Sequence, residues 1–192
     1  ARRCADENRS AQLARVHGLV IPGGESTTLI KLMDAYDFWA PLERFAAAGR
    51  PIFGTCAGMI VLAREVLNPA QKSLGLIDVT IERNSYGRQR DSFEGTDDEG
   101  RRPLVFIRAP RIVAVGADVA VLATLQGEPI LVRQTNVTAA TFHPELTSDR
   151  FMRTPEGKYI VEFLVDGAEY MAVRGVLDDL YAEDPFAATR LL

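Results

Sequence analysis

The sequence is poor in the side chains that most often hold metals or form disulfides. Its 192 residues contain two cysteines and two histidines. Cys4 and Cys56 lie far apart in the chain and in very different local contexts. Such usage fits neither a disulfide framework nor a zinc site, because both need several cysteines or histidines at short spacing. The sequence therefore predicts no metal site, and each cysteine needs its own explanation.

Long apolar runs and an excess of positive charge are missing as well. No apolar stretch reaches the roughly 18 residues needed to span a bilayer, and residues 1–10 lack the apolar segment of a signal peptide. The net charge of −4 gives no field that would gather nucleic acid or an anionic membrane. We expect a cytoplasmic protein with a small-molecule or protein partner, and neither a nucleic-acid nor a membrane partner.

The pattern of apolar residues predicts one α/β domain over residues 1–192. Apolar runs at 17–24 and 50–55 have the length of buried parallel strands, and helical spacing follows them at 26–33 and 57–67. Later in the chain the pattern turns mainly to strands. We expect three layers, with a mostly parallel central sheet and helices on both faces.

Several element boundaries are predicted too. Ser26 is the expected N-cap of the first helix, and a second helix is expected at 41–48, ended by Gly49. Segment 95–103 is polar and contains glycine, which predicts an exposed loop. Residues 150–192 are expected to form a helical C-terminal extension. The strand-like segments of the second half are 79–83, 104–109, 111–116, 119–127, 129–134 and 137–145.

The segment Gly54-Thr55-Cys56-Ala57-Gly58 has the form G-x-C-x-G and lies between a predicted strand and a predicted helix. It is the cysteine counterpart of the nucleophile elbow, in which a strained turn exposes the nucleophile and small neighbours leave room for substrate. A helix N-terminus also favours thiolate over thiol. The alternative is that Cys56 only fills space, because cysteine is among the most often buried residues.

A cysteine nucleophile needs a base, and the chain offers two histidines. His17 has no acidic residue two or three positions away, so we expect it at a strand edge. His143 ends a strand-like run, and Glu145 follows two residues later. In an extended chain both side chains point the same way, so Glu145 can orient the imidazole of His143. The sequence predicts a Cys56–His143–Glu145 triad; the alternative is a strand-end histidine beside a solvated glutamate.

The stretch IPGGESTT, residues 21–28, has adjacent glycines ahead of a helix. A nucleotide-binding role is weakly supported, because the lysine and the spacing of G-x-x-x-x-G-K-[ST] are missing. Backbone N–H groups of Gly23 and Gly24, with that of Ala57, can instead stabilise an oxyanion beside the sulfur of Cys56. The alternative is a capped strand-to-helix turn with no further function.

Several stretches together resemble the glutaminase-subunit family of pyridoxal 5′-phosphate synthase, within the triad (class I) glutamine amidotransferases. They are LVIPGGESTT, GTCAGMIVLA, VTIERNSYGRQRDSFEG, VFIRAP and TFHPE. The G-x-C-x-G and H-P-E elements are shared across the class. GGEST and RNSYGRQRDSFEG separate this family from relatives such as the glutaminase of imidazole glycerol phosphate synthase. The resemblance runs from about residue 16 to residue 149 and implies a flavodoxin-like fold.

The resemblance implies a role for each matched residue. Cys56 would be the nucleophile, His143 the general acid/base and Glu145 its orienter. The glutamine site would consist of Gly24, Glu25, Ser26, Arg83, Ile107 and Arg108. A fixed carboxylate and fixed guanidinium groups suit glutamine, which carries an α-ammonium and an α-carboxylate. For the arginines the alternative is surface ion pairing, which stays open for Arg88 and Arg90.

The resemblance also implies a reaction and a partner. L-glutamine would be hydrolysed to glutamate and ammonia without a metal or cofactor. The ammonia would pass to a (β/α)₈-barrel synthase subunit that makes pyridoxal phosphate from a pentose phosphate and a triose phosphate. Two other functions stay open, a non-catalytic partner-binding module and another Cys-His hydrolase or class I glutaminase. Relatives begin with an apolar strand that residues 1–16 do not match, so we expect the sheet without it.

Overall fold

The computed structural model describes Leu13 and residues 18–83 and 92–146. The helices are α2 (Ser26–Ala35), α3 (Trp39–Ala47), α4 (Ala57–Leu62) and the 3₁₀ helix η2 (Pro144–Leu146). The strands are β1 (Leu19–Ile21), β2 (Ile52–Thr55), β3 (Ala63–Leu67), β4 (Ile77–Glu82), β5 (Phe93–Thr96), β6 (Pro103–Phe106), β7 (Arg111–Val115), β8 (Ala120–Leu125), β9 (Glu128–Gln134) and β10 (Val137–Ala140). The α/β class and the strand-rich second half are confirmed.

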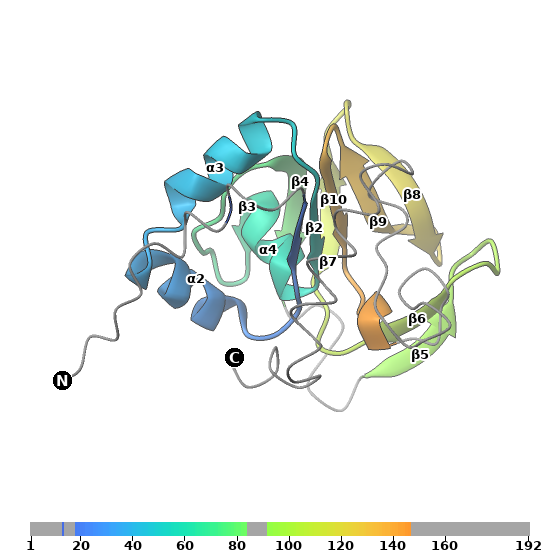
Figure 1. The fold of residues 1–192 in the computed structure, drawn as a ribbon. Helices are drawn as coiled ribbons and strands as arrows, with labels where there is room; N and C mark the ends of the chain where they lie inside the picture. The colour runs from blue at the N-terminus through green and yellow to red at the C-terminus, as the bar shows by residue number, and fades with distance from the viewer. Residues whose placement is uncertain (1–12, 14–17, 84–91, 147–192) are drawn as a thin grey trace, which may run out of the picture.

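The largest sheet has five strands in the order β1-β2-β10-β9-β8. β2 pairs in parallel with β1 and with β10, while β9 pairs antiparallel with β10 and β8. The expected parallel arrangement therefore holds around β2 and gives way to antiparallel hairpins beyond β10, because short turns connect β8, β9 and β10. Smaller sheets are formed by β3-β4-β7 and by β5-β6, as Figure 1 shows.

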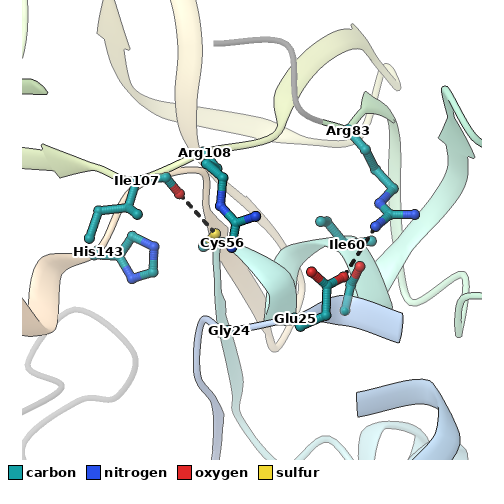
Figure 2. Close-up of a pocket in the computed structure, with 9 residues that line it drawn as sticks. Gly24, Glu25, Cys56, Ile60, Arg83, Ile107, Arg108 and His143 are labelled. Atoms are coloured by element: carbon teal, nitrogen blue, oxygen red, sulfur yellow. Dashed lines mark hydrogen bonds and ion pairs between the residues drawn. The ribbon is translucent and has the colours of Figure 1, made fainter. Parts of the chain in front are cut away.

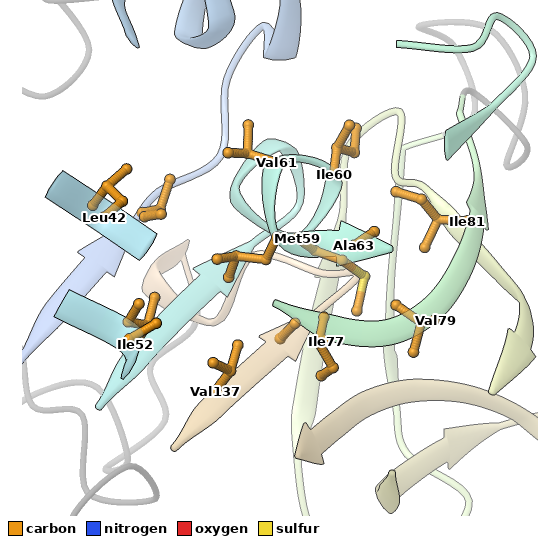
Figure 3. Close-up of a cluster of buried hydrophobic side chains, with 14 of the residues drawn as sticks. Leu42, Ile52, Met59, Ile60, Val61, Ala63, Ile77, Val79, Ile81 and Val137 are labelled. Carbon is orange, nitrogen blue, oxygen red and sulfur yellow. The ribbon is translucent and has the colours of Figure 1, made fainter. Parts of the chain in front are cut away.

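The centre of the large sheet, at β2 and β10, is buried on both faces, as the alternation along β2 shows. Ile52 belongs to one apolar cluster and the adjacent Phe53 to the other. The first cluster packs β2 and β10 against α2, α3 and α4, and Figure 3 shows part of it. The second packs Phe53 against Leu104 and Phe106 of β6. Within the described ranges, strand and loop segments cover this second face, where the sequence predicted helices.

The helix predicted at 57–67 is shorter than expected, since it ends at Leu62 and continues as β3. Tertiary pairing explains the change, because β3 lies parallel to β4 with Val66 opposite Ile81. Backbone N–H groups of residues 74–76 bond to carbonyls at the end of α4, including Leu74 N to Val61 O at 2.7 Å. These hydrogen bonds give partners to the backbone carbonyl groups that the end of a helix leaves unpaired.

Other boundaries shift by smaller amounts. α3 begins at Trp39, two residues before the predicted start, and β5 and β6 extend into the predicted loop 95–103. The extension 150–192 and Cys4, His17, Arg88 and Arg90 lie outside the described residues. In the described part of the chain, no helix is long and apolar enough to cross a membrane.

Candidate active site

One cavity of about 110 Å³ lies where the ends of β2 and β10 meet the N-terminus of α2. Its lining comes from distant parts of the sequence and consists of Gly24, Glu25, Ser26, Cys56, Ile60, Arg83, Ile107, Arg108 and His143. Figure 2 shows these side chains around the sulfur of Cys56. The cavity therefore brings together both predicted reactive side chains and all six residues predicted to bind substrate.

Cys56 occupies a strained turn between β2 and α4. Its backbone has φ 47° and ψ −103°, a conformation that is a genuine outlier for a residue with a side chain. A Cβ at Gly58 would overlap the carbonyl of Ile21, and one at Gly54 would crowd the backbone of Gly58. The glycines are thus required by close approach, as the elbow motif predicts. The Cys56 Sγ lies 3.9 Å from the Ile107 carbonyl oxygen.

His143 follows β10 directly and is held by its backbone. Its N–H donates to the Val105 carbonyl oxygen at 2.8 Å, which joins the end of β10 to β6. The residue is largely buried, with 8% of its surface exposed, and Cys56 is similarly buried, with 5% exposed. The imidazole packs against Gly23, where no Cβ would fit. The ring therefore contacts the glycine loop at Gly23 and also lines the shared cavity.

The glycine loop enters α2 differently from the prediction. Glu25, not Ser26, is the N-cap, and its carboxylate accepts from the Thr27 N–H at 3.4 Å. Ser26 is the first helical residue, and its hydroxyl donates to Gln71 Oε1 at 3.2 Å. Serine is the preferred N-cap of the two, but the Ser26 hydroxyl donates to Gln71 instead. Gly24 has φ 134°, a conformation that favours glycine.

Two arginines bring positive charge to the cavity. Arg83 follows β4, and its guanidinium lies 3.4 Å from the Glu25 carboxylate; 11% of the Arg83 side chain is exposed. Arg108 stands between β6 and β7 with φ 45°, a left-handed conformation that is uncommon for a residue with a side chain. A carboxylate and two guanidinium groups thus line one cavity with the sulfur and the imidazole, a charge arrangement that suits a zwitterionic ligand.

Three predicted residues stand apart from this cavity lining. Gly23 packs under the His143 ring, and Ala57 begins α4, but neither lines the cavity. Glu145 lies in η2, and its side chain is outside the described part of the structure. Ile60 lines the cavity and was not predicted. It lies one helical turn after Cys56, and its N–H donates to the Cys56 carbonyl oxygen at 3.2 Å, so its spacing of four residues from the predicted nucleophile is a usable signal.

The comparisons with known proteins agree on one family. Residues 3–165 match the SNO glutamine amidotransferase family. Over 147 residues the chain is 52% identical to the pyridoxal 5′-phosphate synthase subunit PdxT of Anoxybacillus flavithermus, covering 73% of this chain and 76% of the relative. It is 51% identical over 148 residues to PdxT of Mycobacteroides abscessus, covering 74% and 77%.

A solved structure is also similar. It is described as the crystal structure of a glutamine amidotransferase and is 44% identical, with a TM-score of 0.68, covering 73% of this chain and 77% of that one. The fold and the sequence therefore point to the same group of proteins.

Proposed function

This chain belongs to the SNO glutamine amidotransferase family, and from that premise we propose that it hydrolyses the side-chain amide of L-glutamine. The products are glutamate and ammonia, and the ammonia serves the synthesis of pyridoxal 5′-phosphate, as the names of its relatives indicate. The observation that carries the proposal is the shared cavity. The sulfur of Cys56 and the imidazole of His143 line it together with Glu25 and Arg108.

We assign the two reactive side chains to covalent catalysis. The Cys56 thiolate adds to the carboxamide carbon of glutamine, and the carbon–nitrogen bond then breaks while His143 supplies a proton to the departing ammonia. Water, deprotonated by His143, next attacks the glutamyl thioester, which releases glutamate and restores the thiol. Glu145 is assigned to orient the imidazole through its other ring nitrogen. The strained turn at Cys56 supports this assignment, because it holds the sulfur at the cavity.

The oxyanion of the tetrahedral intermediate needs hydrogen-bond donors that face the sulfur. We assign this role to backbone N–H groups of the glycine loop, Gly23 and Gly24, and of Ala57. Gly24 supports the assignment best, because it lines the cavity. The N–H of Ala57 belongs to the first turn of α4, where helical N–H groups have no partner within the helix.

The charged residues are assigned to the amino-acid end of glutamine. The Glu25 carboxylate pairs with the α-ammonium, and the guanidinium groups of Arg83 and Arg108 pair with the α-carboxylate. Gly24, Ser26 and Ile107 complete this substrate site. The Arg83 guanidinium lies 3.4 Å from the Glu25 carboxylate. This ion pair supports the assignment of the two groups to the two charges of glutamine, because each group holds the other in position at the cavity.

We also propose that the chain acts as one subunit of a synthase. Its relatives are named as synthase subunits, and the sequence resemblance implies a (β/α)₈-barrel partner that receives the ammonia. Transfer to such a partner would keep the ammonia from escaping into solvent. Glutaminase activity that depends on docking would then prevent ammonia release when no partner is bound. No metal or cofactor takes part in the steps assigned above.

Ammonia release tests the proposal. The chain is mixed with its synthase subunit and L-glutamine, and ammonia is measured by a coupled dehydrogenase assay. Wild type is expected to release ammonia, Cys56→Ala is expected to release none, and Lys31→Ala on the exposed face of α2 is the control that stays active. Stable docking without ammonia release from wild type would contradict the proposal and favour a binding module.

A further inference from the structure

A residue outside the cavity lining contacts Ser26, which belongs to the substrate site assigned above. Gln71 lies in the segment between β3 and β4, and its Oε1 accepts a hydrogen bond from the Ser26 hydroxyl at 3.2 Å. Ser26 lines the cavity and exposes 2% of its surface. The contact joins residues 45 positions apart in the sequence, so no local sequence motif predicts it.

This hydrogen bond determines what the Ser26 oxygen can offer to a ligand. A serine hydroxyl has one proton to donate and two lone pairs that accept. Because the proton points to Gln71, a ligand in the cavity meets only an acceptor at Ser26. Glu25, the preceding residue, also presents acceptor oxygens. This end of the cavity is therefore matched to a ligand group that donates hydrogen bonds, such as an ammonium.

The segment that carries Gln71 is held on both sides. Residues 74–76 bond to the end of α4 through Leu74 N–H and Leu76 N–H, at 2.7 and 2.9 Å. The neighbouring Lys72 donates to Asp34 at 2.9 Å, near the far end of α2, and lies over the Trp39 ring. Gln71 and Lys72 thus contact α2 at opposite ends, and only the Gln71 end reaches the cavity.

We infer that Gln71 is a positioning residue that fixes the Ser26 hydroxyl as an acceptor and so favours glutamine over ligands without an α-ammonium. This inference rests on the proposed glutaminase function and adds a determinant of its substrate specificity. Gln71 acts through Ser26 and does not itself touch the substrate.

The variant Gln71→Met removes the acceptor while keeping a side chain of similar length. The Gln71 Nε2 is buried and has no hydrogen-bond partner among the residues that the structure describes, so its removal breaks no hydrogen bond. Removal of Oε1 leaves the buried Ser26 hydroxyl without its acceptor, so the free energy of unfolding should fall, and chemical denaturation checks that each variant is folded in the assay. Lys72→Met is the matched control, because it removes the adjacent contact with α2 between side chains that are more than half exposed.

Steady-state kinetics with the synthase subunit present provide the test, using L-glutamine and 4-carbamoylbutanoate, which lacks the α-ammonium. For Gln71→Met, kcat/KM for glutamine is expected to fall about 5- to 10-fold, the loss of one buried hydrogen bond, mainly through KM. The value for the analogue is expected to change less than about twofold. Ser26→Ala should remove the effect, so that adding Gln71→Met to it causes no further loss.

The outcomes are separable. If wild type is active, three results would overturn the role of Gln71 and leave the proposed function standing. Gln71→Met could lose equally in kcat/KM on both substrates, it could show no loss, or its loss could add to that of Ser26→Ala in the double variant. A Lys72→Met variant that loses as much as Gln71→Met would overturn it too, because the effect would then concern α2 as a whole. A wild type that releases no ammonia from glutamine would overturn the proposed function and this inference together.

Discussion

One methyl group at Gly23 is expected to displace the histidine without unfolding the protein. A Cβ there would stand 2.8 Å from Nδ1 and 3.3 Å from Nε2 of His143, and nearer still to Cε1. Ordinary contact requires about 3.5 Å or more, so the ring has to move by about 1 Å. A misplacement of that size at a catalytic group costs about 100-fold in rate. The backbone at Gly23 is open to alanine, because its φ is not in the left-handed region.

The assay compares Gly23→Ala with Gly95→Ala, where an added Cβ meets open space. Ammonia release with the synthase subunit present gives kcat, and chemical denaturation gives the free energy of unfolding. We expect kcat to fall about 100-fold in Gly23→Ala. The free energy of unfolding should fall by about 1 kcal/mol, the low end of the cost of overpacking. A Gly23→Ala enzyme with kcat within about threefold of the Gly95→Ala control would refute the placement of the ring.

Three further changes test the core, a buried carboxylate and the substrate site. Met59→Ala, at a fully buried position, should lower the free energy of unfolding by about 2–5 kcal/mol in urea titrations. Burial raises the pKa of Asp97, but hydrogen bonds from the Arg102 and Arg101 backbones and the Arg102 side chain lower it below its usual value overall. Asp97→Asn should therefore be less stable than wild type above pH about 4, and the difference should vanish as pH falls through the lowered pKa; equal stability at neutral pH would contradict this. Glu25→Gln should raise KM for glutamine about 10-fold with little change in kcat, since it removes the charge assigned to the α-ammonium; an unchanged KM would exclude that pairing.

Local motifs predicted two of the side chains that the structure brings together at the cavity, Cys56 and His143. The residues that shape the elbow are contiguous, from Gly54 to Gly58, and each glycine is required by contacts close to the turn. His143 was predicted from its place at a strand end, and the parallel pairing of β10 with β2 carries it beside Cys56. Parallel strands gather their carboxyl ends at one edge, so sequence order alone suffices to expect this.

Contacts between distant segments account for what the sequence did not predict. The run after Cys56 has helical composition throughout, yet residues 63–67 form a strand because β4 offers them a parallel partner. Ser26 has the chemistry of an N-cap, but its hydroxyl donates a hydrogen bond to Gln71, 45 residues later, and Glu25 is the N-cap instead. Propensity describes each segment alone, whereas these outcomes depend on a neighbour that only the folded chain supplies.

The most direct test of the account is the covalent intermediate on the cysteine. The chain and its synthase subunit turn over L-glutamine, the reaction is quenched in acid, and peptides are analysed by mass spectrometry. We predict a glutamyl thioester on Cys56 in wild type and a strongly reduced amount in His143→Asn, because proton transfer to the leaving ammonia is then lost. A glutamyl group on another residue, or ammonia release that persists in Cys56→Ala, would contradict the account.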